Sequence, residues 1–424
     1  MKDFFIANRE NFMTKLNAGE MLILFSGKPP KSTADATYTF LPNKNFFYMT
    51  GLKNANFKLA IYKKSDVKSD EKNDGNIQTI LFIEKPNYDI EKWHGRKLTN
   101  EQATAISGIE SIKYIEEFDN WMNRLIYNSS VSTIYLDLEK IKADEEHSFP
   151  HKFGEKLMEK YLFLKIATAH PILADLRTLK TDFEISEVQK AVDITKEGLE
   201  SILKILKPGV MEYQVESTFA HSIRMNGADG NSFPTIAASG PDSFILHYVD
   251  NNKAVPDNSL ILLDLGAQYN QYAADITRTY PVNGKYTLRQ KEIYDIVLKA
   301  QEAVIEIMKP GLPISELNKT SKKVLQEELT RIGLIKSESE LIKYCYHGVS
   351  HYLGLDVHDI GNEDRIIEPG MIFTVEPGVY IVEEEIGIRI EDNILVTKDG
   401  NINLSRDIIK TTEDIEAFMK KFAN

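Results

Sequence analysis

Two kinds of hydrophobic pattern follow one another along the chain. In the first third, short apolar runs alternate with amphipathic segments. This alternation predicts strands at "MLILFSG", "TILFIEKP" and "VSTIYLDL", and helices at "EQATAISGI" and "FDNWMNRLIY". Such a succession is typical of an α/β domain. Between two of its strands lies "KKSDVKSDEKNDGN", residues 63–76, whose polar and turn-forming residues predict an exposed loop.

The pattern changes after "ATAHPILADLRTLKT" to long amphipathic helices. The clearest are "DFEISEVQKAVDITKEGLESILKIL" and "LRQKEIYDIVLKAQEAVIEIM", and each is followed by Lys-Pro-Gly, a signal that ends helices. The repeated signature hints at an internal duplication. We place the domain boundary near Pro171, which predicts an N-terminal α/β domain of residues 1–170 and a second domain of residues 171–424.

The second domain also contains strand-like runs in which β-branched residues are bounded by turn formers. They are "LDLGAQYNQYAADITRTYP", "GMIFTVEPGVYIV" and "EIGIRIEDNILVTKDG". Long helices together with hairpins predict an α+β arrangement for this domain.

Composition narrows the class of protein. A chain of 424 residues with 42% hydrophobic and 27% charged residues is typical of a soluble globular protein with two domains. A net charge of −12 argues against a nucleic-acid partner. The single cysteine, Cys345, cannot form an intramolecular disulfide, and the N-terminal apolar run, Met21 to Phe25, is too short for a signal or a membrane span. We therefore expect a cytoplasmic protein without a membrane partner.

Two aspartates interrupt apolar runs in the first hairpin. Asp264 follows Leu260–Leu263, and Asp275 lies in "YAADIT". If the two strands pair around a turn near Asn270, the two carboxylates face one another. Burying them costs several kcal/mol unless they are compensated. They could cap turns, share a proton or hold a metal between them.

Further acidic residues and histidines favour the metal. Glu376 ends another apolar run, and Arg389 and Glu391 share one face of the strand "GIRIEDN". The stretch "YHGVSHYLGLDVHD" supplies His347, His351 and His358, and spacing alone leaves open which of them binds metal. Four carboxylates with one imidazole balance two divalent cations. Oxygen-rich ligation favours manganese or cobalt, with zinc or iron possible, and such a pair indicates a two-metal hydrolase.

Several segments together resemble a known family. "LDLGAQYNQYAADITRTYPVNGKYT", "HGVSHYLGLDVHD", "TVEPGVY" and "GIRIEDN", in this order, are similar to the signature blocks of the M24 metallopeptidases, which have the pita-bread fold. Within that family they resemble the aminopeptidase P (Xaa-Pro aminopeptidase) group. "FPTIAASGPDSFILHY", "LPNKNFFYMTGL" and "EKWHGRKLT" extend the resemblance over nearly the whole chain.

The resemblance implies roles for individual residues. Ligands of two divalent metals per chain, most plausibly manganese, would be Asp264, Asp275, His351, Glu376 and Glu391. Asp275 and Glu391 would bridge the metals, and Glu376 would also transfer protons at the metal-bound water. His247, His347 and His358 would contact the substrate and steady the tetrahedral intermediate. Arg389 would orient the carboxylates, with Tyr380 beside it.

The implied activity is release of the N-terminal residue from peptides that have proline in the second position. A hydroxide bridging the two metals would attack the first carbonyl, and Glu376 would assist departure of the proline nitrogen. The family's N-terminal domain also implies a homo-oligomer, a dimer or a tetramer.

Four alternatives share part of this pattern. Prolidase has the same ligands but cleaves only dipeptides. Ser350 and the sequence after Asp275 match the aminopeptidase P version better. Methionine aminopeptidase does not suit the large N-terminal domain. A metal-free pita-bread binding module or a creatinase-like enzyme would not need all five metal-competent residues. Asn45 departs from the family, where many relatives carry aspartate, and this puts any contribution of that side chain in doubt.

Overall fold

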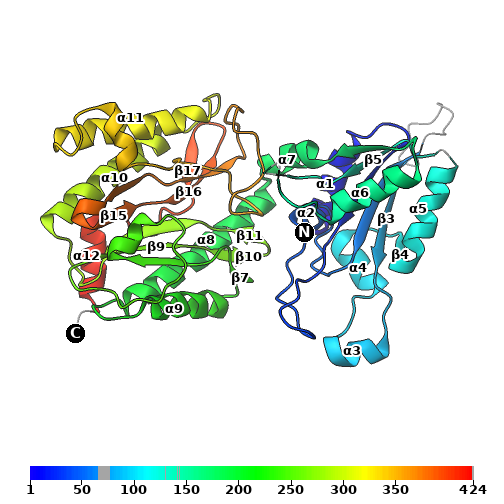
Figure 1. Ribbon diagram of the computed structural model, residues 1–424, viewed down its shortest axis with the longest axis horizontal. Coiled ribbons are helices and arrows are strands. Elements are labelled where there is room, and N and C mark those ends of the chain that lie inside the picture. The colour runs from blue at the N-terminus through cyan, green and yellow to red at the C-terminus, as the bar shows by residue number, and fades with distance from the viewer. Residues whose placement is uncertain (65–76, 129, 141, 143, 423–424) are drawn as a thin grey trace. The chain divides into compact units, whose positions relative to one another are not determined.

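The computed structural model describes residues 1–64, 77–128, 130–140, 142 and 144–422 (Figure 1). The chain forms two compact units, Met1–Leu176 and Arg177–Asn424. The division falls inside helix α7 (His170–Thr178), which contains Pro171. No helix among the described residues has the length and apolar character needed to cross a membrane. The α+β class and the two-domain organisation predicted from sequence are confirmed.

The N-terminal unit is built on a six-stranded sheet with the order β4-β3-β2-β1-β5-β6. Its strands are β1 (Glu20–Phe25), β2 (Lys58–Lys63), β3 (Ile77–Ile83), β4 (Ile112–Tyr114), β5 (Thr133–Leu136) and β6 (Lys165–Thr168). Strand β1 runs parallel to β5 and antiparallel to β2. The three strands expected from apolar runs are β1, β3 and β5. The predicted loop 63–76 begins at the last residue of β2, and its residues 65–76 lie outside the described part of the chain.

Helices complete this unit. They are α1 (Lys2–Met13), α2 (Lys44–Thr50), α3 (Tyr88–His94), α4 (Asn100–Ser107), α5 (Phe118–Tyr127) and α6 (Phe149–Lys160). The hydrophobic side of α5 packs Phe118 and Met122 against Ile23 and Phe82 of the sheet. Asn45, on α2, is buried and donates a hydrogen bond from Nδ2 to Asp137 Oδ2 at 2.9 Å.

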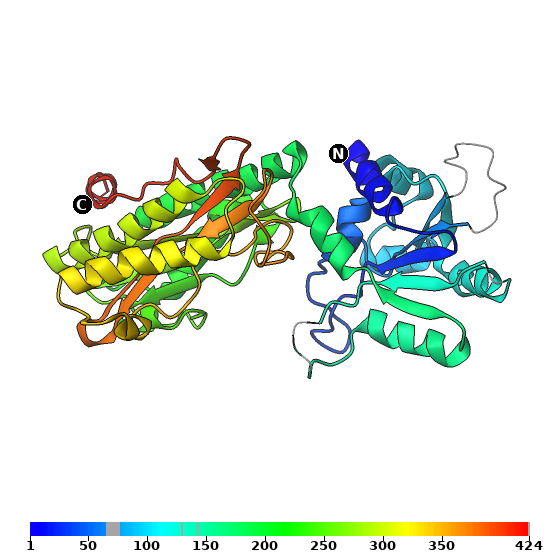
Figure 2. The ribbon, with the colours of Figure 1, turned by 90° about the horizontal axis from the view of Figure 1, so that it is seen from above.

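The C-terminal unit places long helices outside a set of short antiparallel sheets (Figure 2). The helices are α8 (Asp182–Leu203), α9 (Glu212–Met225), α10 (Leu288–Ile307), α11 (Ser315–Arg331) and α12 (Thr412–Lys420). The sheets are β11-β10-β7, β12-β9-β8, β13-β16-β17 and the pair β14-β15. Their strands are β7 (Gly230–Asn231), β8 (Ile236–Ser239), β9 (Leu260–Leu265), β10 (Ala267–Tyr269), β11 (Tyr272–Ala273), β12 (Ile276–Pro281), β13 (Ile372–Val375), β14 (Gly378–Ile381), β15 (Ile386–Arg389), β16 (Asp392–Val396) and β17 (Asn401–Asn403).

The two helices predicted from periodicity are α8 and α10. Each begins with a capping box, formed by Thr181 and Glu184 in α8 and by Thr287 and Gln290 in α10. Each ends before its Lys-Pro-Gly sequence, and each packs against the next helix, α9 or α11. Helix α8 contacts β10 and β11, whereas α10 contacts β13, β14 and β15.

The register of the first hairpin differs from the expected one. Asp264 pairs with Thr277 rather than with Asp275. The reason is the two-residue turn at Asn270 and Gln271, whose φ values of 46° and 72° are those of a tight hairpin turn. This turn shifts the pairing by two residues. Because side chains alternate with a period of two, the shift leaves both aspartates on the same side.

Candidate metal centre

The predicted site residues line one cavity of about 310 Å³ in the C-terminal unit. Its walls hold the nine residues predicted as metal ligands or catalytic residues, which are His247, Asp264, Asp275, His347, His351, His358, Glu376, Arg389 and Glu391, whereas Tyr380 is not part of the lining. Leu246, Gly348 and Ser350 complete the lining. Residues more than a hundred positions apart in the sequence thus meet in one place.

Three of the four carboxylates stand where the chain passes from one sheet to another. Asp275 lies between β11 and β12, Glu376 between β13 and β14, and Glu391 between β15 and β16. Asp264 lies within β9 and shares its sheet with β12. Neither Asp275 nor Glu391 is more than 4% exposed. At these junctions the acidic side chains therefore point into the cavity.

His351 presents one ring nitrogen to these carboxylates. Its Nδ1 lies 2.9 Å from the carbonyl oxygen of Tyr352, which can only accept, so the proton of the neutral ring is on Nδ1. Nε2 then carries a lone pair and lies 3.5 Å from both Asp275 Oδ2 and Glu376 Oε1. Ligand atoms of Asp275, His351 and Glu391 lie within 4.8 Å of one another.

The carboxylates repel one another in this arrangement. Burial, followed by the charges of Asp264 and Glu376, raises the pKa of Asp275 well above its usual value. Burial and the charge of Asp275 do the same to the pKa of Glu391. Burial raises the pKa of Glu376 to about 7, against the opposing charge of Arg389. A cation among these groups would relieve this cost.

The donor set fits a divalent metal. Asp264 Oδ1 and Glu391 Oε1 are buried and have no hydrogen-bond partner among the described residues. An acceptor-only oxygen left in this state is costly, and a lone pair on His351 Nε2 faces two more such acceptors. Carboxylate oxygens with one imidazole nitrogen form a chemically suitable set of ligands for manganese, cobalt, zinc or iron.

Arg389 ties the carboxylates to their surroundings. Its guanidinium donates to Asp264 Oδ2 at 2.6 Å, to the Tyr380 hydroxyl at 2.9 Å and to Thr277 Oγ1 at 3.1 Å. The Thr277 hydroxyl in turn donates a hydrogen bond to Glu391 Oε2 at 2.7 Å, so Thr277 links Arg389 to a second carboxylate. One arginine therefore fixes Asp264 directly and Glu391 through a threonine.

The three histidines outside the carboxylate cluster differ in their contacts. His347 Nδ1 lies 2.7 Å from the Gly348 carbonyl and its Nε2 lies 2.8 Å from the Tyr380 hydroxyl. Burial and the charge of Arg389 lower the pKa of His347 to about 4, so this ring is neutral at pH 7. The His358 ring lies 4.2 Å from the His351 ring between centroids, at an interplanar angle of 57°, and burial lowers the pKa of His358. His247 is exposed on the cavity wall.

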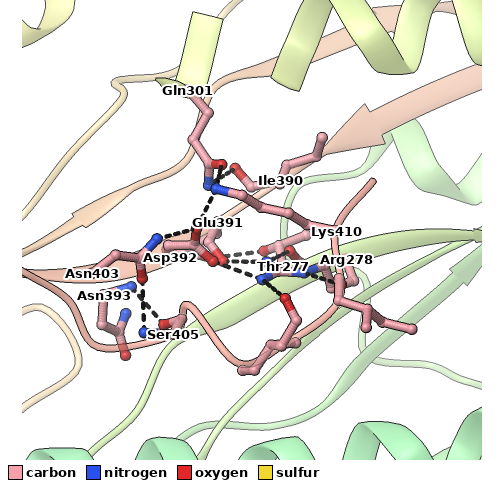
Figure 3. Close-up of polar contacts among 12 residues, drawn as sticks. Thr277, Arg278, Gln301, Ile390, Glu391, Asp392, Asn393, Asn403, Ser405 and Lys410 are labelled. Carbon is pink, nitrogen blue, oxygen red and sulfur yellow. Dashed lines mark hydrogen bonds and ion pairs between the residues drawn. The ribbon is translucent and has the colours of Figure 1, made fainter. Parts of the chain in front are cut away.

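A network of buried hydrogen bonds and ion pairs surrounds Asp392, the residue after Glu391 (Figure 3). Arg278 donates to Asp392 Oδ1 at 2.7 Å and to the Glu391 carbonyl at 2.6 Å. Lys410 donates to Asp392 Oδ2 and to Gln301 Oε1, both at 3.0 Å. Burial alone would raise the pKa of Asp392, but the charges of Arg278 and Lys410 hold that pKa below its usual value. Two cations with one anion leave a positive charge behind the carboxylates.

Sequence reasoning missed this network. Arg278 and Asp392 stand in runs that were interpreted only as strands, and their charges were a usable signal, because a charged residue in a buried strand needs a partner. Gln301 and Asn393 gave no such signal. An amide side chain on a helix or strand is ordinarily a surface residue, and only the fold buries these two.

Comparison with known proteins identifies the family to which the chain belongs. Residues 186–398 match metallopeptidase family M24, and residues 5–135 match the N-terminal domain of aminopeptidase P. The Xaa-Pro aminopeptidase of Haemophilus influenzae is 33% identical over 99% of this chain and 97% of its own. A solved structure from Bacillus anthracis that is assigned to aminopeptidase P superposes with a TM-score of 0.94 at 43% identity, covering 99% of this chain and 98% of the other. Aminopeptidase P from Escherichia coli with the inhibitor Pro-Leu superposes with a TM-score of 0.88 at 31% identity, covering 100% and 99%.

Proposed function

The chain belongs to metallopeptidase family M24 and is a metal-dependent aminopeptidase of the aminopeptidase P type, and from this premise we propose how its site works. The substrates are peptides with proline in the second position, and the product is the free N-terminal residue. The observation that carries the proposal is the lone pair of His351 Nε2 facing Asp275 and Glu376 at 3.5 Å, a contact that calls for a cation.

The proposed ligands are Asp264, Asp275, His351, Glu376 and Glu391. Together these four carboxylates and one imidazole would hold two divalent cations, whose charge the carboxylates would balance. Manganese suits the oxygen-rich set, with cobalt, zinc or iron as other candidates. When bound, the cations supply an activated water whose pKa is lowered to about 7 and polarise the carbonyl to be attacked.

The side chains of the cavity orient the substrate and move protons. Glu376 lines the cavity with Oε1 3.5 Å from His351 Nε2, and a carboxylate at this place is suited to take a proton from the attacking water and pass it to the proline nitrogen. His247 and His358 offer ring nitrogens to the carbonyl on which negative charge develops. Both nitrogens of His347 are engaged by Gly348 and Tyr380, so His347 acts by holding Tyr380 and Arg389 in place.

A substrate with proline at the second position fits this site. Its tertiary amide has no N–H, so the site needs no acceptor for one there. The free α-amine of the first residue would contact a metal or a carboxylate of the site, and this contact would restrict cleavage to the terminus. The prolidase alternative is not favoured, because the similar proteins are Xaa-Pro aminopeptidases. We also propose that the protein works in the cytoplasm as a homodimer or homotetramer.

The test compares two substrates on metal-stripped protein with and without added manganese. An Xaa-Pro-Yaa tripeptide should lose its first residue only when manganese is present, and the matching Xaa-Pro dipeptide should be cleaved poorly. Cleavage restricted to the dipeptide would point to prolidase. Protein that holds two metals per chain and cleaves neither would refute the peptidase assignment. Glu376→Gln should abolish turnover, whereas Glu383→Gln, at an exposed glutamate paired with Lys343, should not.

A further inference from the structure

The sheet junctions that carry the carboxylates create a structural problem. A strand inside a sheet has its N–H and C=O groups paired by its neighbours, but a residue between two sheets needs other partners when it is buried. Asp275 and Glu391 occupy such positions and are almost fully buried. The Glu391 N–H donates to the Thr277 carbonyl at 3.0 Å, and its own carbonyl accepts from Arg278.

Asn393 supplies the missing partner for Asp275. The Asp275 N–H donates to Asn393 Oδ1 at 3.1 Å, and Asn393 Nδ2 donates back to the Asp275 carbonyl at 2.6 Å. This pair of bonds has the pattern of two residues paired in a β-ladder, although β12 and β16 belong to different sheets. Asn393 is itself fully buried, and its N–H donates to Ser405 Oγ at 3.0 Å.

Gln301 performs the equivalent task at the other two junctions. It lies on α10 and is fully buried. Its Nε2 donates to the carbonyls of Val375 at 3.2 Å and Ile390 at 3.3 Å. These are the residues directly before Glu376 and Glu391. Lys410 donates to Gln301 Oε1, and because an ammonium cannot accept, this contact orients the amide so that Nε2 faces the two carbonyls (Figure 3).

We propose that Asn393 and Gln301 are positioning residues for the metal centre, which hold the main chain at the three junctions and thereby set the separation of Asp275, Glu376 and Glu391. The proposal rests on the metal centre proposed above. An amide suits this role because it offers both a donor and an acceptor without adding charge to a cluster that already repels itself. Metal ligands must be held within about 0.5 Å, which junctions between four separate sheets do not ensure without such hydrogen bonds.

The test uses three matched alanine variants: Asn393→Ala, Gln301→Ala and, as the control, Asn401→Ala. Asn401 Nδ2 also makes two hydrogen bonds to main-chain carbonyls, of Ile305 at 2.7 Å and Met308 at 2.9 Å, but Asn401 is not among the residues that line the cavity. Manganese affinity and stoichiometry are measured by titration calorimetry, and the melting temperature is measured on metal-free protein. The visible spectrum of cobalt-loaded protein reports the ligand geometry.

All three variants should lower the melting temperature of metal-free protein. Only Asn393→Ala and Gln301→Ala should weaken manganese binding, by about tenfold to a hundredfold, and alter the cobalt spectrum. Wild-type affinity and an unchanged spectrum in these two variants, with melting temperatures lowered as in the control, would overturn the positioning role. If the alanine variants do not fold, the milder Asn393→Ser and Gln301→Met variants are measured against the same criteria.

The wild-type titration separates the two levels of inference. Wild-type protein that binds no manganese or cobalt would refute the metal centre itself and, with it, any positioning role. Wild-type protein that binds two ions, with unaffected variants, would refute only the role of the two amides.

Discussion

Arg389 and Asp264 form a buried ion pair at the edge of the metal centre, with 2.6 Å between Nη2 and Oδ2. Their side chains are 4% and 13% exposed. The same guanidinium bonds Tyr380 and Thr277, so it holds one carboxylate directly and a second through the threonine. The pair therefore serves orientation as well as charge balance.

Arg389→Lys should reduce kcat/KM by about tenfold to a hundredfold, because an ammonium cannot reproduce the fork that reaches three partners. Steady-state kinetics on the tripeptide at saturating manganese measures this. Arg289→Lys is the matched control. Arg289 likewise bonds more than one partner, Glu384 and Glu292. These ion pairs lie on the surface, where each contributes less than about 1 kcal/mol to stability. Equal kinetics for the two variants would contradict the orienting role.

Metal binding should stabilise the fold by relieving repulsion among the carboxylates. At free manganese about 100 times the dissociation constant, mass action predicts about 2.7 kcal/mol of added stability. Calorimetric melting with chelator and with manganese measures the difference. Asp275→Asn should shrink this increment. The control Asp295→Asn, at an exposed aspartate paired with Lys291, should leave it unchanged.

Asp359 should make stability depend on pH at acid values. Burial alone would raise the pKa of Asp359, but the charges of Arg177 and Lys180 hold it below its usual value. The folded state therefore favours the ionised form, and the resulting stabilisation is present above the ordinary pKa of about 3.9 and is lost as pH falls through the lower folded-state pKa. Asp359→Asn should cost about 3 to 5 kcal/mol at pH 7, because it removes the carboxylate that two buried cations, Arg177 and Lys180, share.

Denaturant unfolding at pH 7 and near pH 3 checks this expectation. The gap between Asp359→Asn and wild type should narrow at the lower pH. Asp356→Asn is the control, since Asp356 bonds the same Arg177 with a side chain that is 39% exposed, and its effect should be smaller. A gap for Asp359→Asn that is independent of pH would show that the depressed pKa contributes nothing to stability.

Tyr380→Phe should slow the reaction more than it destabilises the protein. The tyrosine hydroxyl accepts from Arg389 and lies 2.8 Å from His347 Nε2, so its loss leaves both groups without that partner, at about 1 to 3 kcal/mol. Tyr286→Phe removes a comparable buried hydroxyl, which donates to the Thr279 carbonyl at 2.7 Å. Melting temperature and kcat are measured for both. We expect both variants to lose a similar amount of stability, and only Tyr380→Phe to show a lower kcat.

The candidate ligands could be found from the sequence because local patterns expose them. Asp264, Asp275, Glu376 and Glu391 each break or end an apolar run, and buried charge is costly enough to require compensation. The histidines in "YHGVSHYLGLDVHD" complete the chemistry, although spacing did not separate His351 from its neighbours. The family resemblance made that choice, and all of these side chains line one cavity.

Local patterns were less informative where the energy lies in contacts between distant segments. The expected register of the hairpin was wrong by two residues. The observed register depends on left-handed φ values at Asn270 and Gln271, which the hydrophobic pattern does not predict. The ties from Gln301 to Ile390 and from Asn393 to Asp275 span 89 and 118 residues. Hydrophobic periodicity is a local pattern and cannot predict a hydrogen bond between residues so far apart in the sequence.

The sequence by itself determined the long helices α8 and α10, the strands β1, β3 and β5, the acidic and imidazole side chains, and hence the kind of chemistry. Those properties follow from hydrophobic periodicity and from the charge of single residues. Tertiary structure alone decided which strands end at a junction between sheets and which neutral amides hold Asp275, Glu376 and Glu391 there. An amide shows its role only when folding has removed water and left a particular N–H or carbonyl to be satisfied.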